Sequence, residues 1–425
     1  MGNVFEKIKE ATNTQSKRES IFIFILVVVL IILYLYYRTS NSTPVLPSGR
    51  NITMAAQQTA VEGAYADKSS SKRPEVGRTA PRRSLVNFYA LACRYTGYIG
   101  PIEDGYFDPS VSVQMAVNAG CRVFVLDIDY IDVQCNAKYI PRIVVRDSKG
   151  RMMIQYNDNY RVNNPTGEIR SVCEAIQNKA FGDCQNAADP VIIVLHFLRT
   201  PPGGKKSRSV LQYYSLVAKA LTPFRNRLLG NESSGGTFHR QSQENILLSN
   251  TIDTYSGKVL IFSNADTSGF RDSSASFESY DDLDFLVNLR LIKSDKKNVT
   301  SFGVIESTDY FMNLPEEDKN DAIQQTKMKW TICLSPNPSL PVTQAVYNKL
   351  TTIYGVQCIP AQLFDVEASK FLFADTLFKT HGFTPKPCDD RNSDKCLCYF
   401  PPDIVVAGVT SPTLQVPVLV VNKPL

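Results

Sequence analysis

The chain has 425 residues, of which 20% are charged, and its formal net charge is +5 at pH 7. This length allows one large domain or two ordinary ones. The charge is modest, and aromatic residues do not alternate with basic ones as they do on an RNA-binding sheet. We therefore expect no nucleic-acid partner.

The N-terminal region predicts a membrane anchor. Residues 1–20 form a short segment before an unbroken apolar run at 21–37. This run is close to the lower limit of about 17–25 residues for a transmembrane helix. No small-residue cleavage site follows closely, which favours an uncleaved signal anchor over a signal peptide. Basic residues before the run favour a cytoplasmic-type side for the N-terminus and the opposite side for the rest of the chain.

Residues 38–84 are rich in Ser, Thr, Pro and Ala and show no sustained period, which predicts a flexible stalk. The stalk is basic, and a solvated linker is the simplest interpretation. The alternative is a basic strap for anionic lipid head groups or an acidic protein partner. Its basic residues include Lys68, Lys72, Arg73, Arg78, Arg82 and Arg83.

From residue 85 onward, short runs rich in Val and Ile alternate with helical patterns. We expect strands at 86–92, 122–127, 142–146, 191–197, 258–263, 302–306, 329–334 and 356–363. We expect helices at 111–119, 168–179, 210–229, 343–354 and 366–378. This alternation predicts an α/β protein with parallel strands, a TIM-like (β/α) barrel over residues 85–400. A doubly wound open sheet is the alternative, although its Gly-x-Gly-x-x-Gly turn is missing. We expect residues 401–425, rich in Pro and Val, to form an extended C-terminal tail.

The segment 119–127 predicts a helix that ends at Gly120 and leads directly into a buried strand. Asp127 lies at the carboxyl end of that strand, where the chemistry of a (β/α) barrel takes place. The chain has three histidines, at positions 196, 239 and 381, and none lies near this strand in the sequence. The sequence thus predicts a barrel site with few groups for acid–base chemistry.

Six segments follow one another in an informative order: 88–96, 119–127, 189–196, 255–261, 354–360 and 382–387. In that order they resemble the barrel of phosphoinositide-specific phospholipase C. The second segment resembles a Gly-Cys-Arg-x-x-Glu-Leu-Asp motif, and the last two resemble the closing strand and the Gly-Tyr-x-x-Lys-Pro end of that barrel. The resemblance covers about residues 85–390 and implies the same barrel fold. Versions of this barrel behind one N-terminal span resemble membrane proteins of large DNA viruses.

The resemblance implies a site that has lost its catalytic groups. Members of the family cleave a phosphodiester with two histidines, and many hold Ca²⁺ on one Asn and several carboxylates. Arg94 stands where the first histidine would be, and only Asp127 is retained. The second histidine is expected near Arg146, where this chain has none. Tyr95, Val125 and His196 stand at the positions of an Asn ligand and two Glu ligands.

An inactive barrel follows from these replacements. Arginine stays protonated below pH ~12 and cannot act as a general base. A Ca²⁺ site needs about 6–8 oxygen ligands, which an aspartate, a valine and an imidazole do not supply. We expect no catalytic residue, no metal and no cofactor. Arg94 remains a candidate for bidentate phosphate binding, and the alternative is that it pairs with Asp127 across the barrel mouth.

The C-terminal cysteines are a weaker cluster. Cys388, Cys396 and Cys398 with His381 could hold zinc, but the spacing lacks a Cys-x₂₋₄-Cys pair. A disulfide that ties the C-terminal loop is the alternative in an oxidising compartment.

Three functions remain open. The first is a membrane-anchored, inactive phospholipase C-like barrel that acts as an adaptor in a virion or host internal membrane. Its expected partners are the lipid membrane, through residues 21–37, and a capsid or other viral structural protein. The second is a divergent phosphodiesterase that uses Asp127 with His196 or Asp147. The third is a module that binds anionic lipid head groups through Arg94 and the stalk.

Overall fold

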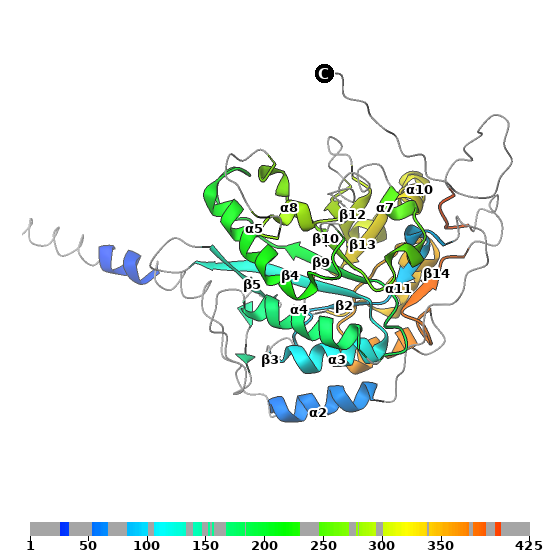
Figure 1. Ribbon diagram of the computed structural model, residues 1–425, viewed down its shortest axis with the longest axis horizontal. Helices are drawn as coiled ribbons and strands as arrows, with labels where there is room; N and C mark the ends of the chain where they lie inside the picture. Colours follow the sequence, from blue (N-terminus) through cyan, green and yellow to red (C-terminus); the bar gives the residue numbers. More distant parts are fainter. Residues whose placement is uncertain are drawn as a thin grey trace, which may run out of the picture.

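A parallel β-sheet forms the centre of the molecule (Figure 1). Its strands are β2 (Ala92–Arg94), β4 (Val123–Asp132), β9 (Val191–Phe197), β10 (Val259–Ser263), β11 (Leu289–Ile292), β12 (Gly303–Ser307) and β13 (Trp330–Leu334). They lie side by side in that order, and every neighbouring pair is parallel. The computed structural model describes residues 26–33, 53–66, 83–100, 106–132, 139–146, 152–153, 155–156, 167–182, 184–229, 246–271, 278, 280–294, 301–337, 340–373, 377–387 and 396–400.

The sheet curls until its two edge strands are joined by one segment. Cys358 forms a parallel bridge with Ile332 of β13 and another with Ala90. Ala361 forms a parallel bridge with Cys93 of β2. The predicted α/β class is confirmed, and the predicted barrel is present as a curled parallel sheet. The expected strand at 142–146 is not one of its parallel strands, because Tyr139–Ile143 pairs antiparallel with β4 and Val145–Arg146 pairs antiparallel with Met152–Met153. The expected strand at 356–363 is present as isolated bridges and not as a continuous strand.

Burial on both faces explains why the strand sequences are almost wholly apolar. Every residue of β10 and of β13 is buried. The interior of the curled sheet holds a core that includes Val125, Phe262 and Trp330, and the last two rings meet edge to face at 4.8 Å. A second core fills the space between the sheet and the surrounding helices.

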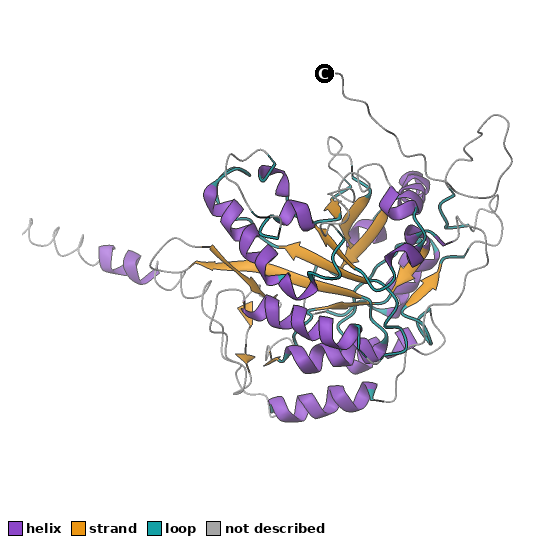
Figure 2. Ribbon diagram, viewed as in Figure 1, coloured by secondary structure: helices purple, strands orange, loops and turns teal. Residues whose placement is uncertain are grey.

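Helices cover the outside of the sheet (Figure 2). The longer ones are α3 (Pro109–Ala119), α4 (Gly167–Ala180), α5 (Arg208–Ala220), α10 (Lys319–Met328) and α11 (Gln344–Thr352). Local sequence sets the ends of α3: Asp108 accepts hydrogen bonds from the first-turn amides, and proline occupies the first helical position. Gly120 ends the helix in the left-handed conformation, with φ of 99°. This turn delivers the chain directly into β4.

Shorter elements complete the described part. β5 (Tyr139–Ile143) runs antiparallel to β4, β1 (Phe88–Ala90) pairs with β14 (Phe383–Pro385), β3 (Tyr106–Phe107) with β8 (Gln155–Tyr156), and β6 (Val145–Arg146) with β7 (Met152–Met153). The short α-helices are α7 (Ile246–Ser249), α8 (Leu283–Leu286), α9 (Thr308–Met312) and α12 (Val366–Ser369). The 3₁₀ turns are η2 (Leu85–Asn87), η3 (Thr222–Phe224), η5 (Ile252–Tyr255), η6 (Thr267–Gly269), η7 (Glu316–Asp318) and η8 (Lys370–Phe373).

Two expected helices end earlier than predicted. The helix expected over 210–229 ends at Ala220, because Pro223 follows in a 3₁₀ turn and cannot donate a helical hydrogen bond. The helix expected over 366–378 is divided into α12 and η8 within the described residues.

The structure also differs from the expectation of an irregular stalk at 38–84. Residues Met54–Tyr65 form helix α2, which packs beside α3 (Figure 1). Thr53 caps its first turn, and Val61 is fully buried against the barrel. Tyr65 donates its hydroxyl to the carbonyl of Leu363 at 2.8 Å. At least this part of the predicted stalk is docked on the barrel.

The predicted anchor and tail lie largely outside the described residues. Of the apolar run at 21–37, the structure describes 26–33, which is helical with side chains mostly exposed. Within the described part of the chain, no helix is both long and apolar enough to cross a bilayer. The tail at 401–425 and His239 lie outside the described residues.

Candidate functional site

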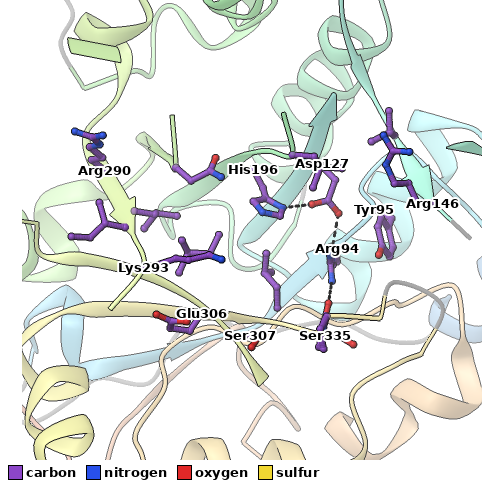
Figure 3. Close-up of a pocket in the computed structure, with 18 residues that line it drawn as sticks. Arg94, Tyr95, Asp127, Arg146, His196, Arg290, Lys293, Glu306, Ser307 and Ser335 are labelled. Atoms are coloured by element: carbon purple, nitrogen blue, oxygen red, sulfur yellow. Dashed lines mark hydrogen bonds and ion pairs between the residues drawn. The ribbon is translucent and has the colours of Figure 1, made fainter. Parts of the chain in front are cut away.

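A cavity of about 600 Å³ opens at the carboxyl ends of the barrel strands (Figure 3). Most strands contribute a residue near or just beyond their last position, as expected for a (β/α) barrel. Asp127 is different: the sequence analysis expected its strand to end there, but β4 continues to Asp132. The polar lining residues are Arg94, Tyr95, Asp127, Arg146, His196, Asn264, Arg290, Lys293, Glu306, Ser307 and Ser335. The structure therefore brings together four of the five residues on which the sequence analysis centred. Val125 lies instead in the apolar interior of the barrel.

Arg94 and Asp127 form a buried ion pair on the cavity floor. Arg94 ends β2 and donates its Nε to Asp127 Oδ2 at 3.0 Å. Its Nη1 donates to the carbonyl of Ser335 at 2.9 Å. The two side chains are only 8% and 2% exposed. The alternative in which Arg94 pairs with Asp127 is confirmed, and its predicted role in phosphate binding stays a prediction.

The second oxygen of Asp127 is also engaged. His196 is the direct cross-strand partner of Asp127 in the parallel pairing of β4 with β9. Its Nδ1 lies 2.5 Å from Asp127 Oδ1. Because side chains on one face of neighbouring strands are adjacent, this register alone places the imidazole against the carboxylate. The result is a chain of three groups, Arg94–Asp127–His196, drawn as dashed lines in Figure 3.

Electrostatics favour the ionised form of Asp127. Burial by itself would raise the pKa of this carboxyl, but the charge of Arg94 and the hydrogen bond from His196 hold it below its ordinary value. Burial also opposes the charge of Arg94, yet its pairing with Asp127 keeps the pKa of the guanidinium raised. The carboxylate is neutralised from two sides and offers no spare oxygen to a reacting group.

Tyr95 has a strained backbone beside this pair. Its φ is +58°, and it is the single non-glycine residue with positive φ in the part of the chain that the structure describes. Such a conformation costs of order 1–3 kcal/mol for a bulky side chain. The guanidinium carbon of Arg94 lies 4.9 Å from the centre of the Tyr95 ring, which itself packs near Phe364. The strain therefore falls where the chain turns from β2 into the cavity rim.

The segment expected to hold a second family histidine includes Arg146. This residue lines the cavity and pairs with Asp129, which is fully buried. Asp129 also accepts from Arg199 Nε at 2.7 Å, so two guanidinium groups share one carboxylate. Asp147, the alternative partner for Asp127, lies outside the described residues.

The opposite rim carries residues that the sequence analysis missed. Arg290 lies on β11 and pairs with Asp266, and exposed Lys293 follows the same strand. Glu306 on β12 accepts a hydrogen bond from the amide of Ser294 at 2.5 Å. Arg290 and Lys293 were missed because β11, a four-residue strand, was not recognised. Glu306 lies on the strand expected at 302–306, but it was not considered as a site residue. The alternation of Leu289, Arg290 and Leu291 was the available signal.

The residues present do not fit the calcium ion that the family resemblance implies. Asp127 uses both oxygens internally, Val125 offers no ligand atom, and His196 offers a nitrogen to a cation that prefers oxygen. No group of three or more His, Cys, Asp or Glu side chains arranged to hold a metal occurs among the described residues.

The zinc alternative at the C-terminus is also disfavoured. Cys398 is disulfide-bonded and therefore has no thiolate to offer a metal. Cys388 lies outside the described residues. A disulfide at Cys398 agrees with the alternative weighed for these cysteines, and the tie of the C-terminal loop stays a prediction.

Comparisons with known proteins give matches of fold only. No protein-family model and no curated protein matches the sequence. Among solved structures, PLC21 of L. pealei shares 16% identity and a TM-score of 0.44, over 72% of this chain and 37% of the other. PLC21 of S. officinalis shares 13% identity and a TM-score of 0.45, over 82% and 46%. The chain thus spans less than half the length of either structure.

A bacterial structure is covered almost completely. The calcium-dependent phosphoinositol-specific phospholipase C of a Pseudomonas species matches 72% of this chain and 96% of its own, at 10% identity and a TM-score of 0.39. At such identities and overlaps, the likeness gives no information on activity or substrate.

Proposed function

We propose that this protein is a phospholipase C-like barrel without phosphodiesterase activity. The observation that carries the proposal is the Arg94–Asp127–His196 chain. Asp127 is the one acid retained from the family pattern, and each of its two carboxylate oxygens is already hydrogen-bonded to a neighbouring side chain. A cationic guanidinium stands where a proton acceptor is needed, and it cannot act as a base near neutral pH.

The role we propose is that of a membrane-bound adaptor. The apolar run at 21–37 would anchor the chain, and the barrel would lie on the side opposite the N-terminus. The disulfide at Cys398 supports an oxidising surrounding for the barrel. The proposed partners are the lipid membrane and a capsid or other viral structural protein that holds membrane and shell together. Alkaline extraction of membranes tests the anchor. We expect the full chain to stay in the membrane fraction and a chain that lacks residues 21–37 to be released.

Calcium binding tests the inactivity at the level of the residues. Titration of the full chain with Ca²⁺ is expected to produce no saturable heat and no change in thermal unfolding. A ligand at 100 times its Kd would stabilise the folded state by about 2.7 kcal/mol, which is easily detected. Saturable binding that is lost in Asp127→Asn would contradict the proposal.

A divergent phosphodiesterase is the second candidate, and one contact favours it. The bond from Asp127 to Nδ1 of His196 fixes the imidazole at the cavity, as an aspartate orients a catalytic histidine in hydrolases. The side chain of His196 is 17% exposed. If His196 were a general base, hydrolysis of phosphatidylinositol or a glycerophosphodiester would fall by about 10²–10⁴-fold in His196→Gln. The same loss in the control His381→Gln would assign the effect to something other than this site.

A further inference from the structure

An unusual polar cluster lies at the other end of the barrel, where the strands begin. Arg122 immediately precedes β4, and its side chain is fully buried. Its Nη1 donates to the carbonyl of Ala180 at 2.7 Å, at the end of α4. Its Nη2 donates to Asn186 Oδ1 and to Cys184 Sγ, the latter at 3.4 Å. This cluster is separate from the cavity and plays no part in the function proposed above.

The cluster has an excess of donors. Arg122 Nε and the amide nitrogen of Asn186 are buried and have no hydrogen-bond partner. Arg122 forms no ion pair with any acid in the described ranges, and burial lowers the pKa of its guanidinium. A buried donor without a partner typically costs about 1–3 kcal/mol. Two buried donors therefore lack an acceptor, and a negatively charged acceptor would be favoured by the guanidinium beside it.

Cys184 is the group placed to supply the acceptor. Its thiol is free and half-buried, and it also lies 3.4 Å from the carbonyl of Ala180. Cys93 and Cys173 are also free, but both are buried. Burial raises the pKa of both thiols, that of Cys93 to about 12. Cys184 is thus more accessible than either, and a guanidinium contacts its sulfur directly.

We propose that Cys184 is a reactive thiol that is oxidised by hydroperoxides, and that Arg122 and Asn186 hold the oxidised sulfur. The thiolate attacks one oxygen of the hydroperoxide, an S–O bond forms, and the O–O bond breaks. The sulfur loses two electrons to the peroxide, and the leaving alkoxide or hydroxide takes up the proton that the thiol released. The product is a sulfenic acid.

The product satisfies the cluster better than the thiol does. Its added oxygen is a strong acceptor, whereas sulfur is a weak one. Arg122 Nη2 already contacts the sulfur and is the nearest donor for the added oxygen. Arg122 Nε and the amide of Asn186 are further donors in the same cluster that have no partner. Charge-assisted hydrogen bonds of this kind are about twice as strong as neutral ones. Oxidation at this position therefore stabilises the folded chain.

Alkylation of the full chain separates an activated thiol from a merely accessible one. Folded and urea-unfolded protein are treated with iodoacetamide at pH ~6, below the ordinary thiol pKa of about 8.5, and each cysteine-containing peptide is quantified by mass spectrometry. The guanidinium that contacts the sulfur favours the thiolate, which is the reactive form. We expect Cys184 to react about threefold faster in the folded protein than in the unfolded one. A folded rate equal to or below the unfolded rate would overturn the proposal.

Hydroperoxide treatment tests the redox step itself. With hydrogen peroxide as the oxidant and dimedone as the trap, Cys184 is expected to be labelled before Cys173. In Asn186→Ala the Arg122 contact to sulfur is kept but one donor for the added oxygen is removed, so the sulfenic acid should decay faster to further oxidised forms. Arg122→Lys should lower the labelling rate if it folds. Equal labelling of Cys184 and Cys173 would contradict the proposal whether or not that variant folds.

Discussion

Asp127 and His196 lie directly opposite each other on two neighbouring parallel strands, with Oδ1 and Nδ1 2.5 Å apart. The other carboxylate oxygen of Asp127 accepts from Arg94. A carboxylate that is shared in this way links β2, β4 and β9 at the barrel mouth. The stability of the protein should therefore depend on Asp127.

Replacement of Asp127 by Asn should destabilise the protein strongly. Removal of one partner from a buried ion pair typically costs about 3–5 kcal/mol, because the remaining charge is left without compensation. Urea unfolding of Asp127→Asn measures the change in the free energy of unfolding. The matched control is Asp266→Asn, whose pair with Arg290 is 36–45% exposed and should contribute about 0–1 kcal/mol. Equal losses in the two variants would contradict the account.

The same carboxylate predicts an acid-sensitive fold. The pKa of Asp127 is lower in the folded state than its ordinary value of about 3.9. Its stabilising contribution is therefore fully present above pH ~4 and is lost as the pH falls through the folded-state pKa. Urea midpoints measured from pH ~6 to pH ~3 should fall more steeply for the natural protein than for Asp127→Asn. Parallel profiles would show that Asp127 does not carry this dependence.

Buried Lys386 predicts a gain in stability on replacement. It donates to the carbonyl of Thr326 at 3.1 Å, and burial holds its pKa well below the ordinary value. A charged amine is disfavoured there, so Lys386→Met should stabilise the fold by about 1–2 kcal/mol near neutral pH. The advantage should shrink as the pH approaches about 10, where the unfolded lysine also loses its proton. Thermal unfolding at several pH values measures it, and a pH-independent difference would contradict the explanation.

Gly63 tests whether α2 is a stable helix, and Gly97 serves as a contrasting site where a side chain does not fit. A Cβ at Gly63 would meet nothing within 4 Å, so Gly63→Ala should stabilise helix α2 by about 0.5–1 kcal/mol. A Cβ at Gly97, where φ is +104°, would lie 2.6 Å from the Phe107 ring, so Gly97→Ala should destabilise the fold. Chemical unfolding of both variants is the measurement. No effect at Gly63 would indicate that residues 54–65 do not contribute a stable helix.

Much of the barrel could be predicted from the sequence because its strands are buried runs of apolar residues. The strand expected at 191–197 has the observed bounds. Local pattern fails where an element is short or polar: β11 has four residues, and α10 has few apolar positions for its length. Helix α2 was missed because a composition of Ala, Gln and Thr resembles a linker until Val61 and Tyr65 find a surface to pack against.

The candidate site could be predicted only in part. Asp127 was singled out by the rule that barrel chemistry lies at the carboxyl ends of strands, although β4 continues beyond it to Asp132. The family resemblance already placed Asp127 and His196 in one site as an alternative acid–base pair. Their direct contact depends on the register of two strands that are far apart in the sequence, which no local pattern predicts. The contribution of Lys293 and Glu306 depends likewise on β11 and β12 lying across the cavity.

Single-turnover hydrolysis tests the central claim most directly. The full chain, in excess over radiolabelled phosphatidylinositol in mixed micelles, is incubated with Ca²⁺ and, separately, with a chelator. The account predicts that no water-soluble inositol phosphate forms above the blank in either condition. Product that forms with the natural protein and disappears in both Asp127→Asn and His196→Gln, with each variant shown to be folded, would contradict it.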